Sequence, residues 1–214
     1  MRVGGLGIAG LLLPLLAALL VFPALAAAAT PVDDAVALYR QKKFPEARSL
    51  LEPIASAEPT NAPASYWLGM AYLRQGGPTG LDSARLWLGK ALKLEPGNET
   101  YQADYAGVCL LMADRDSSFS LALEGRDGMT RAIAANPSDL GACEGLMRFY
   151  AKAPWPLGSP VRARSLADHI AKLDPKRGAA AYLAIAAIFE KDGLKQDSLS
   201  AAQAAQALAQ DHPH

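Results

Sequence analysis

The short stretch DRDSSF (114–119) has the most suggestive spacing of oxygen-bearing side chains in the sequence. Its D-x-D-x-S order begins like a calcium-binding loop, in which carboxylate and hydroxyl oxygens surround the ion. The rest of the pattern fails, because Phe119 stands where the loop needs glycine and Gly125 stands where it needs glutamate. The stretch therefore indicates a solvated, hydroxyl-rich turn.

The other sequence patterns that support catalysis or metal binding are missing as well. There is no G-x-S-x-G, no H-E-x-x-H and no phosphate-loop pattern. The three histidines, His169, His212 and His214, are too few and too scattered to form a metal site. The glycine-rich GLGIAG (5–10) lies in an apolar leader, where it carries no meaning for nucleotide binding. We therefore predict no enzyme activity, no cofactor and no metal.

The N-terminus has the organisation of an export signal. Arg2 precedes an uncharged apolar run at 6–21, small residues follow, and the tripeptide at 24–26 fits the A-x-A cleavage pattern. We predict a signal peptide over residues 1–26, with cleavage between 26 and 29. The predicted location is the periplasm if the source is a Gram-negative bacterium, and otherwise the outside of the cell. The alternative is an uncleaved anchor, but about 16 apolar residues fall short of the roughly 20 that span a bilayer.

The charge balance argues against several classes of partner. The 214 residues contain 21 basic and 21 acidic side chains, for a formal net charge of zero. A balanced chain has no long-range attraction to nucleic acid or to anionic lipid. We expect no nucleic acid as a partner, and no membrane for the mature chain unless the N-terminal segment is retained as an anchor.

Five similar phrases divide the rest of the chain into units. Each closes on a proline, and the intervals between these prolines are 37, 41, 38 and 38 residues for Pro59, Pro96, Pro137, Pro175 and Pro213. Twelve residues before each proline stands a small residue, and apolar or small residues follow at eight and five before it. Steps of four and three define one helical stripe, and recurrence near this period is typical of helical repeat arrays. We predict two helices in each unit, the second ending before the proline.

The second unit carries a family resemblance. WLGMAY (67–72), followed by Ala84, Leu88, Ala91 and Pro96, is similar to the tetratricopeptide repeat. The resemblance covers residues 31–213 and implies an all-α fold: a right-handed superhelical array of helix-turn-helix repeats in one solenoid domain. It implies little about function, because the same fold serves many unrelated partners. About five repeats result, at 31–60, 61–98, 99–138, 139–176 and 177–213.

A second resemblance concerns residues 149–178, FYAKAPWPLGSPVRARSLADHIAKLDPKRG. This segment is similar to a subset of small secreted bacterial repeat proteins, although it departs from them at Trp155-Pro156. Trp155 is predicted to fold back onto the array, because large apolar side chains are usually buried. The alternative is an outward-pointing anchor that a partner would contact.

The units are longer than the roughly 34 residues of a minimal repeat. Because the distance from the small residue to the proline is constant, we predict that the extra residues lengthen the turn inside each unit. Such turns are expected on one edge of the array. They correspond to QGGPTGLDS (75–83), ADRDSSFSLALEG (113–125), KAPWPLGSP (152–160) and KDGLKQDS (191–198).

Two cysteines, Cys109 and Cys143, could pair in an oxidising compartment. They lie on neighbouring first helices but are offset by seven positions in the repeat register, about 10 Å along the helix axis. A disulfide needs Cα atoms within about 7 Å of each other. We favour two buried thiols over a disulfide.

The resemblance implies that the first helices line a concave face, which is the usual binding place for a partner segment. We predict an exported, non-enzymatic adaptor that binds another protein there; the alternative is an accessory protein that holds a saccharide or small molecule in the concavity. Each candidate residue could instead pack between repeats. The partner-binding candidates are Tyr39, Arg40, Tyr66, Met70, Arg74, Glu144, Arg148, Lys152, Tyr182 and Phe189 on the face, with Trp155 on the edge.

Overall fold

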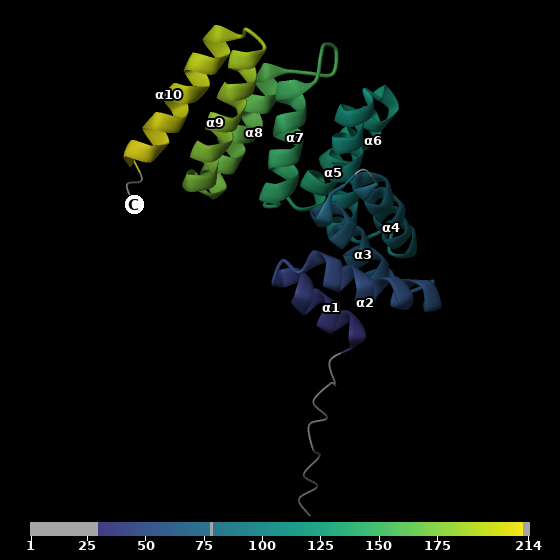
Figure 1. Cartoon of the computed structure of the whole chain (residues 1–214). Helices are drawn as coiled ribbons and strands as arrows, with labels where there is room; N and C mark the ends of the chain where they lie inside the picture. Colours follow the sequence, from purple (N-terminus) through teal and green to yellow (C-terminus); the bar gives the residue numbers. More distant parts are fainter. Residues whose placement is uncertain (1–29, 78, 212–214) are drawn as a thin grey trace, which may run out of the picture.

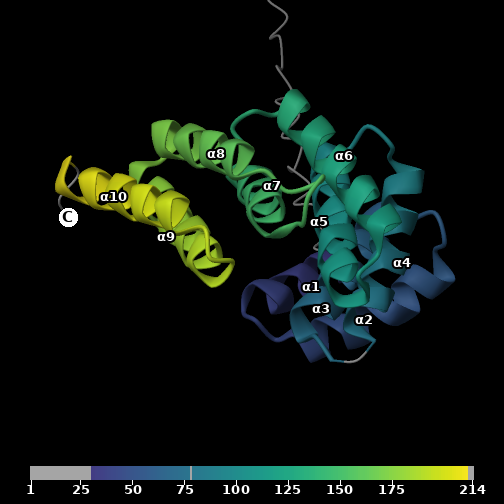
Figure 2. The same ribbon diagram turned by 90° about the horizontal axis from the view of Figure 1, so that it is seen from above.

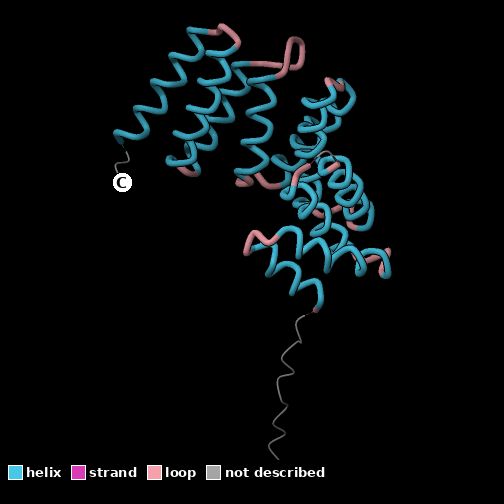
Figure 3. The backbone as a smooth tube through the Cα atoms, viewed as in Figure 1, coloured by secondary structure: helices cyan, strands magenta, loops and turns pink. Residues whose placement is uncertain are grey.

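The structure is a computed structural model that describes residues 30–77 and 79–211. Within them the chain forms ten α-helices and no strand (Figures 1 and 3). The predicted signal peptide, residues 1–26, lies outside the described residues. The helices are α1 (Pro31–Arg40), α2 (Phe44–Ala57), α3 (Ala62–Gln75), α4 (Gly80–Leu94), α5 (Glu99–Asp116), α6 (Phe119–Ala135), α7 (Leu140–Lys152), α8 (Pro160–Leu173), α9 (Pro175–Lys191) and α10 (Lys195–Asp211).

Consecutive helices pack against each other along the whole array. The first helices of neighbouring units also touch, in the pairs α1 with α3, α5 with α7, and α7 with α9. Seen from above, the odd-numbered helices lie on the inner side of a curve and the even-numbered helices on its outer side (Figure 2). The predicted all-α superhelical array of helix-turn-helix units is confirmed. No helix in the described part of the chain is long and apolar enough to cross a bilayer.

The small-residue stripe of the second helices is the backbone of the core. Close approach of helices explains it: a Cβ on Gly125 would lie 2.6 Å from Leu110 Cδ2, so only glycine lets α6 pack this tightly on α5. Gly69 of α3 meets Leu88 of α4 in the same way, at 2.8 Å from Cγ. The stripe positions twelve and eight residues before the prolines are all buried: Ala47, Ala84, Gly125, Ala163 and Ala201, then Leu51, Leu88, Met129, Ala167 and Ala205.

Each of the helices α2, α4, α6 and α8 ends two residues before its proline, as predicted. The following first helix begins under a side-chain cap, because the orphan N–H groups of a helix start need acceptors. Asn61, Asn98 and Asp139 supply these caps, each two residues after the proline. The fourth boundary differs: Asp174 ends α8 and also caps α9, whose first residue is Pro175. No loop separates these two helices.

The prediction that extra residues lengthen the turns is wrong for the third unit. The turn between α5 and α6 is only Ser117 and Ser118, and the helices themselves are longer, with 18 and 17 residues. Ser117 takes a left-handed conformation that ends α5, and the Ser118 hydroxyl accepts from the N–H of Leu121 to begin α6. The hydroxyl-rich stretch is thus a helix boundary. Only residues 153–159, between α7 and α8, form a long turn.

Candidate functional site

A row of aromatic rings crosses the first helices of the N-terminal units. Tyr39 of α1 packs edge-on against Trp67 of α3 at a centroid distance of 5.1 Å, and Trp67 meets Tyr66 at the same distance. Tyr66 then stacks on Tyr101 of α5 at 4.5 Å. Tyr66 and Met70 are each 7% exposed. These two predicted partner contacts therefore pack between repeats, and little of either side chain is open to a ligand.

Asp104 of α5 lies beside this row and was not among the predicted residues. The hydroxyl of Tyr66 donates a 2.6 Å hydrogen bond to its Oδ2 atom. Burial raises the pKa of the Asp104 carboxyl, while the hydrogen bond from Tyr66 and the nearby Arg74 act to lower it. Burial and the neighbouring carboxylate hold the pKa of Tyr66 well above its usual range. The pair joins α3 to α5 across 38 residues of sequence, one repeat apart.

Ion pairs fix other candidates on the inner side. Arg177 of α9 contacts Glu144 of α7 at 2.9 Å, and Lys152 of α7 contacts Asp114 of α5 at 2.5 Å. Nε of Arg74 donates to the hydroxyl of Tyr39 at 3.2 Å. These contacts link neighbouring first helices, but the pairs with Lys152 and Arg74 remain exposed to solvent. Exposed ion pairs contribute little to stability, so these charges stay available to a partner.

Three further side chains of the inner side are open to solvent. Arg148 of α7 is exposed and has no hydrogen-bond or ion-pair partner among the described residues. Leu111 of α5 is 52% exposed and Leu183 of α9 is 58% exposed. Neither leucine was predicted as a contact. Arg40 at the end of α1 is also exposed.

The structure moves two predicted contact residues into the core. Tyr182 is 5% exposed and Phe189 is 1% exposed, so neither can reach a partner. The cause is a register shift of one residue in α9. The buried positions of α7 lie 5, 6, 9, 10 and 13 residues after Pro137, whereas those of α9 lie 6, 7, 10, 11 and 14 residues after Pro175. One residue turns a helix by about 100°. The shift brings Leu183 to the surface that Tyr182 was expected to occupy.

The early start of α9 accompanies this shift and has a sequence signal. The other boundaries read EPTN, EPGN and NPSD, with the capping residue two places after the proline. The last reads LDPKRG, with Asp174 directly before the proline and no Asn or Asp after it. An acceptor followed by proline is the pattern of a helix that begins at that proline.

Trp155 is 89% exposed, so the prediction that it folds back onto the array is wrong. The loop that carries it is closed on itself. The N–H of Gly158 donates to the carbonyl of Pro154 at 2.9 Å, and the N–H of Ser159 donates to the carbonyl of Tyr150 at 2.8 Å. The loop satisfies its own backbone without using the indole, which leaves the ring in solvent.

Both cysteines are free and buried, as favoured from the sequence. Burial raises the pKa of the Cys109 thiol and of the Cys143 thiol, so neither is an activated nucleophile. Among the described residues no group of three or more His, Cys, Asp or Glu could hold a metal ion.

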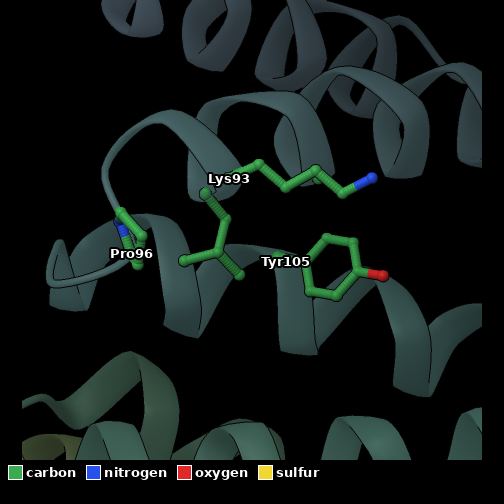
Figure 4. Close-up of a pocket in the computed structure, with 5 residues that line it drawn as sticks. Lys93, Pro96 and Tyr105 are labelled. Carbon is green, nitrogen blue, oxygen red and sulfur yellow. The ribbon is translucent and has the colours of Figure 1, made fainter.

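Two shallow grooves run along second helices rather than along the inner side. One, of about 400 Å³, is lined by Gly89, Leu92 and Lys93 of α4, with Pro96 and Tyr105 beyond them (Figure 4). The glycine keeps it open, because a Cβ there would lie 3.1 Å from Cε2 of Tyr105. The other, of about 370 Å³, lies among α8, α9 and α10, next to Lys172 and Leu208. Neither groove supports the expectation of a small molecule in the concavity.

Comparison with known proteins identifies the fold. No protein-family model matches the sequence, and no curated protein matches it either. Among solved structures, MamA 41-end from Desulfovibrio magneticus RS-1 has a TM-score of 0.66 at 16% identity, covering 86% of this chain and 96% of that chain. Another MamA structure has a TM-score of 0.65 at 18% identity, with 84% and 90% covered. YrrB, described as a TPR protein with an unusual peptide-binding site, has a TM-score of 0.62 at 17% identity, with 85% and 86% covered. These likenesses show the tetratricopeptide-repeat fold.

Proposed function

We propose that this chain is an exported, non-enzymatic adaptor that binds a segment of another protein on the inner side of its curve. The observation that carries the proposal is the set of solvent-open side chains on the first helices. Arginines are exposed on α1, α3 and α7, and leucines are exposed on α5 and α9, at positions 40, 74, 148, 111 and 183. Arginine is among the residue types enriched in protein interfaces, and exposed leucines offer apolar area to bury.

The chemistry of these side chains suggests the kind of segment that fits. Guanidinium groups form paired hydrogen bonds with carboxylates, and the leucines need apolar contacts. A segment that carries both acidic and apolar side chains satisfies both. The similar structure of YrrB, whose description names a peptide-binding site, supports a peptide-like ligand at the level of the fold. Export rests on the predicted signal peptide at residues 1–26.

Charge reversal tests the location. Arg148→Glu should abolish capture of partner proteins by crosslinking in intact cells, because it places a carboxylate against the acidic segment. Lys172→Glu is the matched control: it reverses an exposed positive charge on α8, on the outer side of the curve. If both variants capture the same proteins as the unchanged chain, the inner side is not the binding site. Recovery of the chain only from the cytoplasmic fraction would contradict export.

A further inference from the structure

The most exposed apolar side chains of the described residues are not on the inner side but on the loop between α7 and α8. Trp155 is 89% exposed, and Val161, in the first turn of α8, is 79% exposed. Pro154 and Pro156, on either side of the tryptophan, are exposed as well. A cluster of apolar side chains held in water is uncommon unless a binding event covers it.

The loop is built to hold this cluster in place. Besides the two backbone hydrogen bonds that close it, a Cβ on Gly158 would overlap the carbonyl oxygen of Ala153, so only glycine permits the closure. Ser159 caps α8 through the N–H of Arg162, which fixes the second end of the loop. A preorganised loop loses little conformational entropy when its tip is bound.

Other apolar side chains continue the cluster along one edge of the array. The turns α5–α6, α7–α8 and α9–α10 lie at the same end of their helices, at the top of Figures 1 and 3. Phe119, the first residue of α6, is 59% exposed, and Leu194, in the last of these turns, is 38% exposed. We call Phe119, Trp155, Val161 and Leu194 the turn edge. Four apolar contacts spread over three units suit an extended surface better than a single pocket or one peptide strand.

Positive charge gathers behind the tip of the loop. Residues 145–167 contain four cationic side chains, at positions 148, 152, 162 and 164, and no acidic one, although the whole chain is neutral. The guanidinium of Arg162 lies over the ring of Tyr150, 5.3 Å from its centroid, at the base of the loop. Lys152, at the end of α7, is exposed and pairs only with Asp114. The apolar tip therefore stands in front of a cationic base.

We propose that the turn edge docks peripherally on an anionic lipid surface. Tryptophan favours the interface between headgroups and acyl chains, and cations set behind it lie at the depth of the anionic headgroups. This goes beyond the adaptor function and leaves the inner side free for a partner. It also departs from the expectation, based on net charge, that the mature chain has no membrane partner, because the local charge differs from the total. With one tryptophan and few cations, the binding is reversible.

Vesicle flotation tests the proposal with the purified chain as the cell exports it. The probe is phosphatidylcholine vesicles with about one-third phosphatidylglycerol, against pure phosphatidylcholine at the same low salt. The chain should float with the anionic vesicles only. Trp155→Ala should weaken this binding about tenfold through lost apolar contact, and Arg162→Gln about fivefold through one lost charge. Every variant carries the same N-terminus, so differences between variants report the turn edge alone.

Leu86→Ala is the matched control, because Leu86 is 68% exposed on α4, away from these three turns. It should bind vesicles like the unchanged chain, and circular dichroism should show that all variants fold. The proposal is overturned if the unchanged chain does not bind the anionic vesicles, or if Leu86→Ala weakens binding as much as Trp155→Ala. It is also overturned if Trp155→Ala removes a protein crosslink but leaves vesicle binding intact, since the edge would then be a protein contact.

Discussion

Tyr66→Phe removes a single hydroxyl from the inner side and should lower the free energy of unfolding by about 2 kcal/mol at neutral pH. The ring is 7% exposed and keeps its stacking on Tyr101, so the change acts only on the 2.6 Å hydrogen bond to Asp104. Without that donor a part-buried carboxylate stays unpaired. Hydrogen bonds to charged groups contribute about 1.5–3 kcal/mol, which sets the expected size.

The cost should depend on pH, with a sign that the environment of Asp104 determines. Burial raises its pKa above the ordinary value of 3.8, helped by Asp139 and opposed by Tyr66 and Arg74. A carboxyl whose pKa is raised on folding favours the folded state below the ordinary value, and that contribution is lost as pH rises through the raised value. Removing the hydroxyl raises the pKa further. The cost of Tyr66→Phe is therefore full at neutral pH and shrinks as acid protonates Asp104.

Urea unfolding followed by circular dichroism, at neutral pH and near pH 4, measures both quantities. Tyr101→Phe is the control: Tyr101 is similarly buried at 8% exposure, and its hydroxyl has no hydrogen-bond partner among the described residues. A double-mutant cycle with Asp104→Asn isolates the pair. The reasoning is refuted if Tyr66→Phe costs less than about 0.5 kcal/mol, or if its cost is equal at the two pH values.

Two other predictions concern the core. Gly69→Ala should cost about 1–3 kcal/mol, because the new Cβ would lie 2.8 Å from Cγ of Leu88; Gly97→Ala, with nothing within 4 Å, should be nearly neutral in the same urea titration. Cys109 and Cys143 should not react with a thiol reagent until the chain unfolds, and a reducing agent should leave the melting temperature unchanged. A melting temperature that falls on reduction would contradict the free-thiol assignment.

The sequence was sufficient for the architecture because the strongest constraint on it is periodic. The small residues at Ala47, Ala84 and their equivalents must allow two helices to approach, and proline must end each second helix. Both requirements are local in sequence, so their spacing could be read directly. Turn lengths could not be read in this way. Extra residues in the third unit extended α5 and α6, because Ser117 and Ser118 can end one helix and begin the next with no loop.

The candidate site was less predictable because it depends on rotation and on neighbours. Tyr182 and Phe189 were misplaced by one residue, which is enough to turn a side chain from surface to core. Tyr66 was placed on the correct helix, but its burial comes from Tyr101, one repeat away. The exposure of Trp155 depends on how its loop closes on its own backbone. None of these properties lies within one helix, so periodicity cannot report them.

Asp174 has a consequence for how the array comes apart. In most repeat arrays a flexible joint separates successive units, and each unit can fray from its neighbour as a separate step. Here one residue serves both helices, so unwinding the end of α8 removes the cap of α9 and leaves its first N–H groups unpaired. The last two units therefore melt as a single cooperative block, and an insertion at this joint breaks two helices at once.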